Sequence, residues 1–144
     1  AVVTGGQAMI MRPGIRTFAT DLWSRRRGLQ GVDRPEAGWV CDRFSCRPES
    51  GGVLAMSWSR KAPDTGTLEA LCGSARVVSL RASVPVLPAA CDGRLVLDGT
   101  DYAEGGAVEL WRDGSGWRAV WSARVRGDRP WSAQPDPDVS DSDG

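Results

Sequence analysis

Residues 53–80 read VLAMSWSRKAPDTGTLEALCGSARVVSL, two apolar runs separated by a polar loop and a short helical segment. The first six and the last six residues of this stretch are rich in apolar residues and predict strands, the second of them buried. Thr67 to Cys72 predicts a helix of about two turns, with Asp64 or Thr65 as its N-cap. The stretch therefore predicts a strand, a helix and a strand in succession.

The flanking sequence adds further strands and one more helix. We expect hairpin strands at 2–3 and 8–11, a helix at 17–26, a loop at 28–37, and strands at 39–44, 94–98, 107–111 and 117–121. The linker SCRPESGG joins the strands at 39–44 and 53–58 in this interpretation. The order predicts a strand-rich α+β fold with two short helices packed on a mixed sheet, and mixed α/β is the alternative.

The composition predicts one folded domain and one tail. Apolar residues make up 41% and charged residues 25%, as in a globular protein. Residues 132–144 hold four Asp and no Lys or Arg. We expect a single globular domain over residues 1–131 with a net charge of +4, followed by a disordered acidic tail over residues 132–144.

Two features of the sequence bear on targeting to or across a membrane. No apolar run approaches the roughly 20 residues that span a bilayer. The start AVVTGGQAMIMRPG has neither the basic region nor the apolar block of a signal peptide. The sequence also lacks an initiator Met, so we expect this chain to be a piece of a longer protein.

Histidine is absent from the sequence, and 17 of the 18 basic residues are Arg. The absence of His excludes Ser-His-Asp and Cys-His catalysis and any metal site built on imidazole. Asp42, Asp92, Asp98, Asp101 and Glu104 are candidate carboxylates, but their spacing matches no metal-binding loop. We expect no catalytic residue, no metal ligand and no cofactor.

Four cysteines, Cys41, Cys46, Cys72 and Cys91, leave three interpretations open. A zinc site would want two close pairs, and only the first pair is close. Buried free thiols in a reducing compartment are the second interpretation. We favour two disulfides in an oxidising compartment. Cys41–Cys46 and Cys72–Cys91 is one of the three connectivities that the sequence leaves open.

Arginine clusters are the candidate contacts for phosphate, because the guanidinium pairs with phosphate in a bidentate manner. The candidate phosphate contacts are Arg25, Arg26, Arg27, Arg124, Arg126 and Arg129. Trp131 is a candidate for stacking on a base. A solvated basic surface and ordinary core packing of Trp are the alternatives.

Several motifs in this order resemble a known family. They are GGQAMIMRPG, FATDLW, CDRFSC, ARVVSL, RLVLD, AVELW with WRAVW, and RGDRPW, together with the two later cysteines. The set is similar to the C-terminal soluble region of ComEC-type competence proteins, in the form found in alphaproteobacteria. The resemblance covers nearly all of residues 1–131.

That resemblance implies a role in natural transformation, in which ComEC-type channels of the inner membrane carry single-stranded DNA into the cell. Many members end in a metallo-β-lactamase-like domain proposed to degrade the non-transported strand. That domain needs an H-x-H-x-D-H motif, which this chain lacks. The chain looks like a degenerate, metal-free counterpart, so the nuclease activity does not carry over.

The expected function is therefore a non-catalytic domain at the periplasmic face of the inner membrane. It would guide DNA to the pore or scaffold the pore, with DNA, the channel part of the same parent protein and other uptake proteins as partners, and with no small-molecule ligand. The alternatives are a carboxylate-metal nuclease that degrades the non-transported strand and a purely structural or oligomerisation module.

Overall fold

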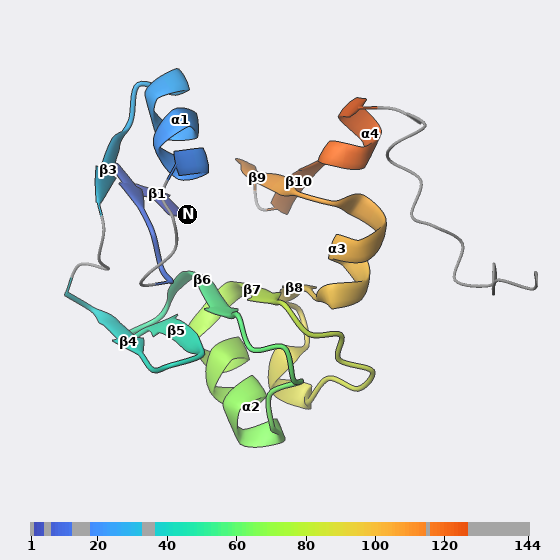
Figure 1. The fold of residues 1–144 in the computed structure, drawn as a ribbon. Coiled ribbons are helices and arrows are strands. Elements are labelled where there is room, and N and C mark those ends of the chain that lie inside the picture. The colour runs from blue at the N-terminus through green and yellow to red at the C-terminus, as the bar shows by residue number, and fades with distance from the viewer. Residues whose placement is uncertain (1, 5–6, 13–17, 33–36, 115, 127–144) are drawn as a thin grey trace, which may run out of the picture. The chain divides into compact units, whose positions relative to one another are not determined.

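The computed structural model describes residues 2–4, 7–12, 18–32, 37–114 and 116–126. Two compact units divide the chain, unit 1 over residues 1–99 and unit 2 over residues 100–144 (Figure 1). The expectation of one domain over residues 1–131 stays a prediction. The tail over residues 132–144 lies outside the described residues.

A small three-stranded sheet is formed by the N-terminal part of unit 1. Strand β1 (Val2–Thr4) pairs antiparallel with β2 (Gln7–Met9), which confirms the expected hairpin. Helix α1 (Phe18–Arg26) then connects β2 to β3 (Gln30–Val32), which pairs with β2 in parallel. The helix confirms the prediction, whereas the expected loop at 28–37 was wrong in part because it contains β3.

The larger sheet of unit 1 has five strands in the order β4-β5-β6-β7-β8. The strands are β4 (Trp39–Cys41), β5 (Ser45–Pro48), β6 (Gly52–Ser57), β7 (Ala75–Leu80) and β8 (Leu95–Leu97). Strands β4, β5 and β6 are antiparallel neighbours, and β6, β7 and β8 are parallel neighbours. The sheet is mixed, as the sequence predicts.

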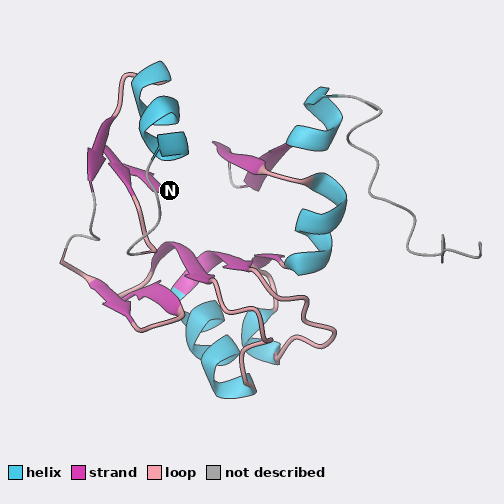
Figure 2. Cartoon of the chain, in the orientation of Figure 1, coloured by secondary structure: helices cyan, strands magenta, loops and turns pink. Residues whose placement is uncertain are grey.

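Helix α2 (Thr65–Ser74) crosses between the parallel strands β6 and β7. Asp64 is its N-cap, and the Oδ1 atom of Asp64 accepts a hydrogen bond from the backbone N–H of Thr67 at 2.8 Å. This bond is the largest cause that lowers the pKa of Asp64 below 3.8. A short 3₁₀ helix, η1 (Ala89–Cys91), lies beside α2 on the same face of the sheet (Figure 2).

The hydrophobic core of unit 1 lies between this face of the sheet and α2. Its buried members are Ala55, Leu68, Leu71, Cys72, Ala75, Val78, Leu80 and Cys91. Each fully buried Leu or Val stabilises the fold by about 1.5–3 kcal/mol. Val77, next to Val78 in β7, is also buried. Since neighbouring side chains of a strand point to opposite faces, β7 is buried on both of its faces, as parallel strands commonly are.

Unit 2 contains a hairpin flanked by two helices. Strands β9 (Val108–Asp113) and β10 (Gly116–Trp121) pair antiparallel over their full length, as expected. Helix α3 (Gly99–Gly105) precedes the hairpin and α4 (Ser122–Arg126) follows it. Tyr102 of α3 meets Trp121 of β10 edge to face, with ring centroids 5.9 Å apart, a favourable geometry for aromatic pairs.

Candidate nucleic-acid interface

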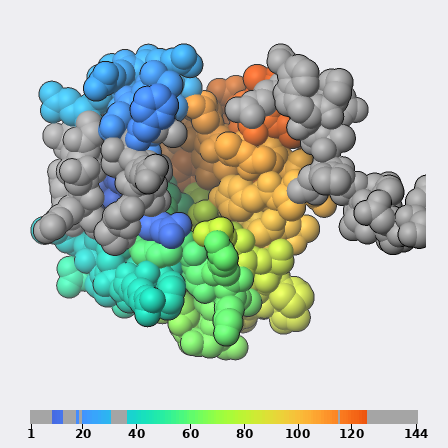
Figure 3. All heavy atoms as spheres, viewed as in Figure 1, coloured from blue at the N-terminus to red at the C-terminus, as the bar shows by residue number. Residues whose placement is uncertain are grey.

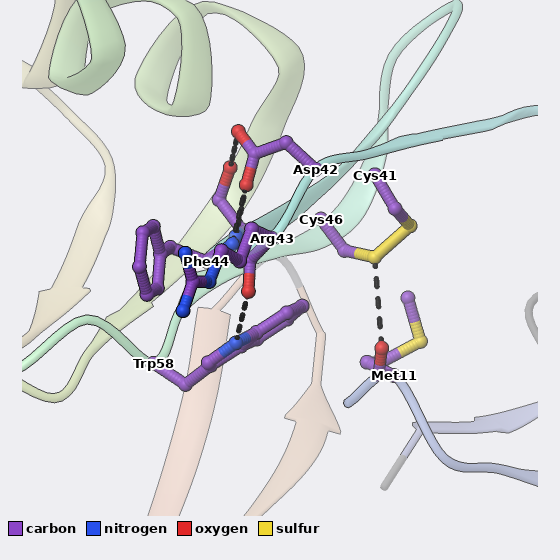
Figure 4. The surroundings of a disulfide bond; sticks show 8 residues. Met11, Cys41, Asp42, Arg43, Phe44, Cys46 and Trp58 are labelled. Carbon is purple, nitrogen blue, oxygen red and sulfur yellow. Dashed lines mark hydrogen bonds between the residues drawn. A yellow bond between two sulfur atoms is a disulfide. The ribbon is translucent and has the colours of Figure 1, made fainter. Parts of the chain in front are cut away.

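The stretch Cys41 to Cys46, CDRFSC, forms the end of the β4–β5 hairpin. Cys41 and Cys46 are directly opposed in the ladder and form a disulfide, with their Cα atoms 4.1 Å apart (Figure 4). Antiparallel pairs that lie between hydrogen-bonded pairs bring their Cα atoms this close. The Sγ atom of Cys46 lies 3.7 Å from the backbone carbonyl of Met11, a buried residue that follows β2.

Asp42 organises the turn between the two strands. Its Oδ1 atom accepts hydrogen bonds from the backbone N–H groups of Phe44 and Ser45, each at 2.6 Å. Its Oδ2 atom accepts a bond from the Ser45 hydroxyl at 2.8 Å. Desolvation raises the pKa of Asp42, but these three hydrogen bonds outweigh it and the pKa lies below 3.8. The carboxylate of Asp42 is therefore a structural group of the turn.

Trp58, the residue after β6, holds the same turn from the other side. Its indole Nε1–H donates to the carbonyl of Arg43 at 2.9 Å, and its backbone N–H donates to the carbonyl of Phe44 at 2.9 Å (Figure 4). Phe44 is 49% exposed, and the guanidinium carbon of Arg43 lies 5.1 Å from the centroid of its ring. The turn thus presents one cation and one aromatic ring to solvent.

The second disulfide joins Cys72 of α2 to Cys91 of η1, with Cα atoms 4.9 Å apart. Both residues are buried in the core. The structure therefore forms two disulfides in the connectivity Cys41–Cys46 and Cys72–Cys91 and leaves no cysteine free to bind zinc.

The arginines proposed from the sequence fall into two groups in different units. Arg25 and Arg26 end α1 and Arg27 follows it, and all three are exposed. In α4, Arg124 is exposed and Arg126 is the last residue. Arg129 and Trp131 lie outside the described residues.

The candidate carboxylates do not form a metal-binding group in the described part of the chain. Asp98, after β8, accepts a hydrogen bond from the backbone N–H of Val84 at 2.7 Å. Asp92 follows η1, and Asp101 and Glu104 belong to α3. Within the described ranges, no group of three or more His, Cys, Asp or Glu side chains could hold a metal ion. No helix there is long and apolar enough to cross a membrane.

From the sequence, core packing is favoured over base stacking for Trp58, and Arg43 has no predicted contact role, although the fold brings the two residues together. They are 15 residues apart, and only the pairing of β4, β5 and β6 makes them neighbours. Comparison with known proteins finds no match to a family model, to a curated protein or to a solved structure.

Proposed function

We propose that this chain is a non-catalytic domain of a DNA-uptake channel, placed at the periplasmic face of a bacterial inner membrane. It guides DNA toward the pore through arginine contacts to phosphate and scaffolds the channel. The motif resemblance is the origin of this proposal. The observation that supports it best is the pairing of all four cysteines in two disulfides, because such bonds persist in oxidising compartments.

Exposed arginines support the DNA-contacting part of the proposal. Arg25, Arg26 and Arg27 form a continuous basic run at the end of α1. Arginine contacts to phosphate give affinity that is independent of base sequence and falls with salt. A body with a net charge of +4 over residues 1–131 is weakly basic, so we expect weak binding by the isolated chain.

The test is a binding titration with single-stranded and duplex DNA at salt concentrations between about 50 and 200 mM. We expect the logarithm of the binding constant to fall linearly with the logarithm of the salt concentration. The variant Arg25→Gln/Arg26→Gln should bind DNA more weakly than the unaltered chain. The control is Arg76→Gln/Arg94→Gln, which removes two other exposed cations of unit 1. Absence of binding at every salt concentration would refute the DNA-contacting role.

The same samples separate the two alternatives. Metal-dependent cleavage of duplex DNA that is lost in Asp98→Asn or Asp101→Asn would replace the proposal with a carboxylate-metal nuclease. Defined oligomers without any DNA binding, measured by light scattering, would replace it with a structural or oligomerisation module.

A further inference from the structure

Three segments of unit 1 leave the five-stranded sheet at the same edge. Strands β4, β6 and β7 run in one direction, because β5 is antiparallel to both β4 and β6, and β7 is parallel to β6. The turn after β4 and the chain after β6 are joined by the bond from Trp58 N–H to Phe44 O at 2.9 Å. The chain after β7 is joined to β6 by the bond from Arg81 N–H to Ser57 O at 2.9 Å.

Cations and aromatic rings gather at this edge. Arg43 follows β4, Arg60 and Lys61 follow β6, and Arg81 follows β7, and all four are exposed. No described acid forms an ion pair or hydrogen bond with these four side chains. We call the four cations, with Phe44 and Trp58, the basic-aromatic edge. Figure 3 shows turquoise atoms of the β4–β5 hairpin next to green atoms of the chain that follows β6.

The acidic groups near this edge have structural partners. Asp42 receives three hydrogen bonds inside its own turn. Asp64 caps α2, and Asp98 receives the N–H of Val84. These three carboxylates keep their charge, since N–H donors stabilise the ionised form. Four exposed cations against three carboxylates leave an excess of one positive charge at this edge, which favours an anionic partner.

The aromatic residues decide which polyanion fits best. Phe44 is half exposed on a turn whose backbone is held by Asp42, by Trp58 and by a disulfide. The guanidinium carbon of Arg43 lies 5.1 Å from the centroid of its ring. An exposed ring beside cations is the arrangement that binds unpaired bases, since stacking needs a free base face while cations follow the backbone. A duplex hides its base faces inside the helix. Ligands of α/β sheets also bind outside the carboxyl ends of parallel strands.

We propose that the basic-aromatic edge binds single-stranded DNA, with a base stacked on Phe44 and with Arg60, Lys61 and Arg81 on the phosphates. This rests on the proposed function and adds a second contact surface to the arginines of α1. It also adds a preference for single strands over duplex.

Charge at the edge is tested on the full chain with a fluorescein-labelled oligothymidylate of about 12 nucleotides, within the usual range of site sizes. Arg60→Gln/Arg81→Gln removes two cations at the carboxyl ends of β6 and β7. Its control, Arg76→Gln/Arg94→Gln, removes two exposed cations near the amino ends of β7 and β8. We expect the edge variant alone to lower the salt slope of log affinity by about 1.4, the value for two single-strand phosphate contacts.

Stacking is tested by Phe44→Leu, which keeps an apolar side chain and removes the ring. The matched control is Phe18→Leu, because Phe18 is the other Phe of the chain and is 80% exposed at the start of α1. Loss of a stacked base lowers affinity by about fivefold or more. We expect this loss for oligothymidylate with Phe44→Leu, little change with Phe18→Leu, and little change for duplex DNA with either variant. Intact-mass spectrometry of each variant serves as the control that both disulfides have formed.

The outcomes separate the two proposals. If the unaltered chain binds DNA but the edge and control variants behave alike, the edge is not the site, and the proposed function stands. If the unaltered chain binds no DNA, the DNA-contacting function and the edge site fail together. Edge-dependent binding to vesicles of anionic phospholipid, without binding to oligothymidylate, would overturn the single-strand assignment.

Discussion

Asp42 shows how one side chain can fix the conformation of a turn. Its two carboxylate oxygens receive three hydrogen bonds from Phe44 and Ser45. Asp commonly bonds to backbone groups two or three residues ahead in this way. The exposed positions of Arg43 and Phe44 therefore depend on a residue that need not touch a ligand.

Replacement of Asp42 by Asn should lower the free energy of unfolding by about 1 kcal/mol near pH 7, a value reduced by solvent screening of this exposed group. The pKa of Asp42 is lowered in the folded state, so its stabilisation is present above pH 3.8 and is lost as the pH falls through the folded pKa. Denaturant unfolding from pH 7 to pH 2 measures this. Asp92→Asn, at an exposed carboxylate, is the control, and a difference from the original chain that persists undiminished at pH 2 would contradict the argument.

Two glycines should respond oppositely to the same substitution. A Cβ at Gly99 would lie 2.7 Å from both Arg81 O and Ser83 N, whereas a Cβ at Gly73, inside α2, would meet nothing within 4 Å. We expect Gly99→Ala to destabilise the fold by about 1–3 kcal/mol. Gly73→Ala should stabilise it by about 0.5–1 kcal/mol, because Ala is the better helix former. Thermal unfolding of both variants measures whether stability rises or falls. A change in the same direction for both variants would contradict the close packing at Gly99.

Among the elements, prediction from sequence succeeded where apolar patterning was strong. Strands β6 and β7, helix α2 between them, and the β9–β10 hairpin match their predicted ranges closely. Strand β5 was missed because Ser45–Pro48 contains Arg and Pro, and its burial comes only from its place between β4 and β6. Helix α3 was missed because Asp98-Gly99 has the composition of a turn. Helix α4 was also not predicted.

The two disulfides should differ in their contribution to stability, because they close loops of different length. Cys72 and Cys91 are 19 residues apart, and Cys41 and Cys46 are five apart. On the chain-entropy model the longer loop contributes about 3 kcal/mol and the shorter one about 2 kcal/mol. We expect Cys72→Ala/Cys91→Ala to lower the denaturant midpoint more than Cys41→Ala/Cys46→Ala. The reverse order would show that native packing at the hairpin outweighs loop length.

For the whole molecule, the disulfides predict a defined covalent state. Protein exported to an oxidising compartment should be four hydrogen atoms lighter than its reduced form, and alkylation without a reductant should leave its mass unchanged. Intact-mass spectrometry under non-reducing conditions decides this. Alkylation of four thiols would show that the cysteines are free. A zinc adduct under native conditions would support a zinc site built from the cysteines instead.

At this scale the sequence reveals less of the candidate site than of the fold. Consecutive arginines such as Arg25, Arg26 and Arg27 are visible as a run. Arg43, Arg60 and Arg81 are separated by 17 and 21 residues, and they share a surface only because β4, β6 and β7 end at the same edge. A surface built from strand register cannot be derived before the strand order is known.

The order of the cysteine pairs has a consequence for biogenesis. Each cysteine is bonded to its neighbour in the sequence, Cys41 to Cys46 and Cys72 to Cys91, so neither loop encloses the other. When a chain enters an oxidising compartment N-terminus first, an oxidase that joins cysteines in their order of arrival makes the native bonds directly. Maturation of this chain should therefore need a disulfide-forming oxidase and no disulfide isomerase.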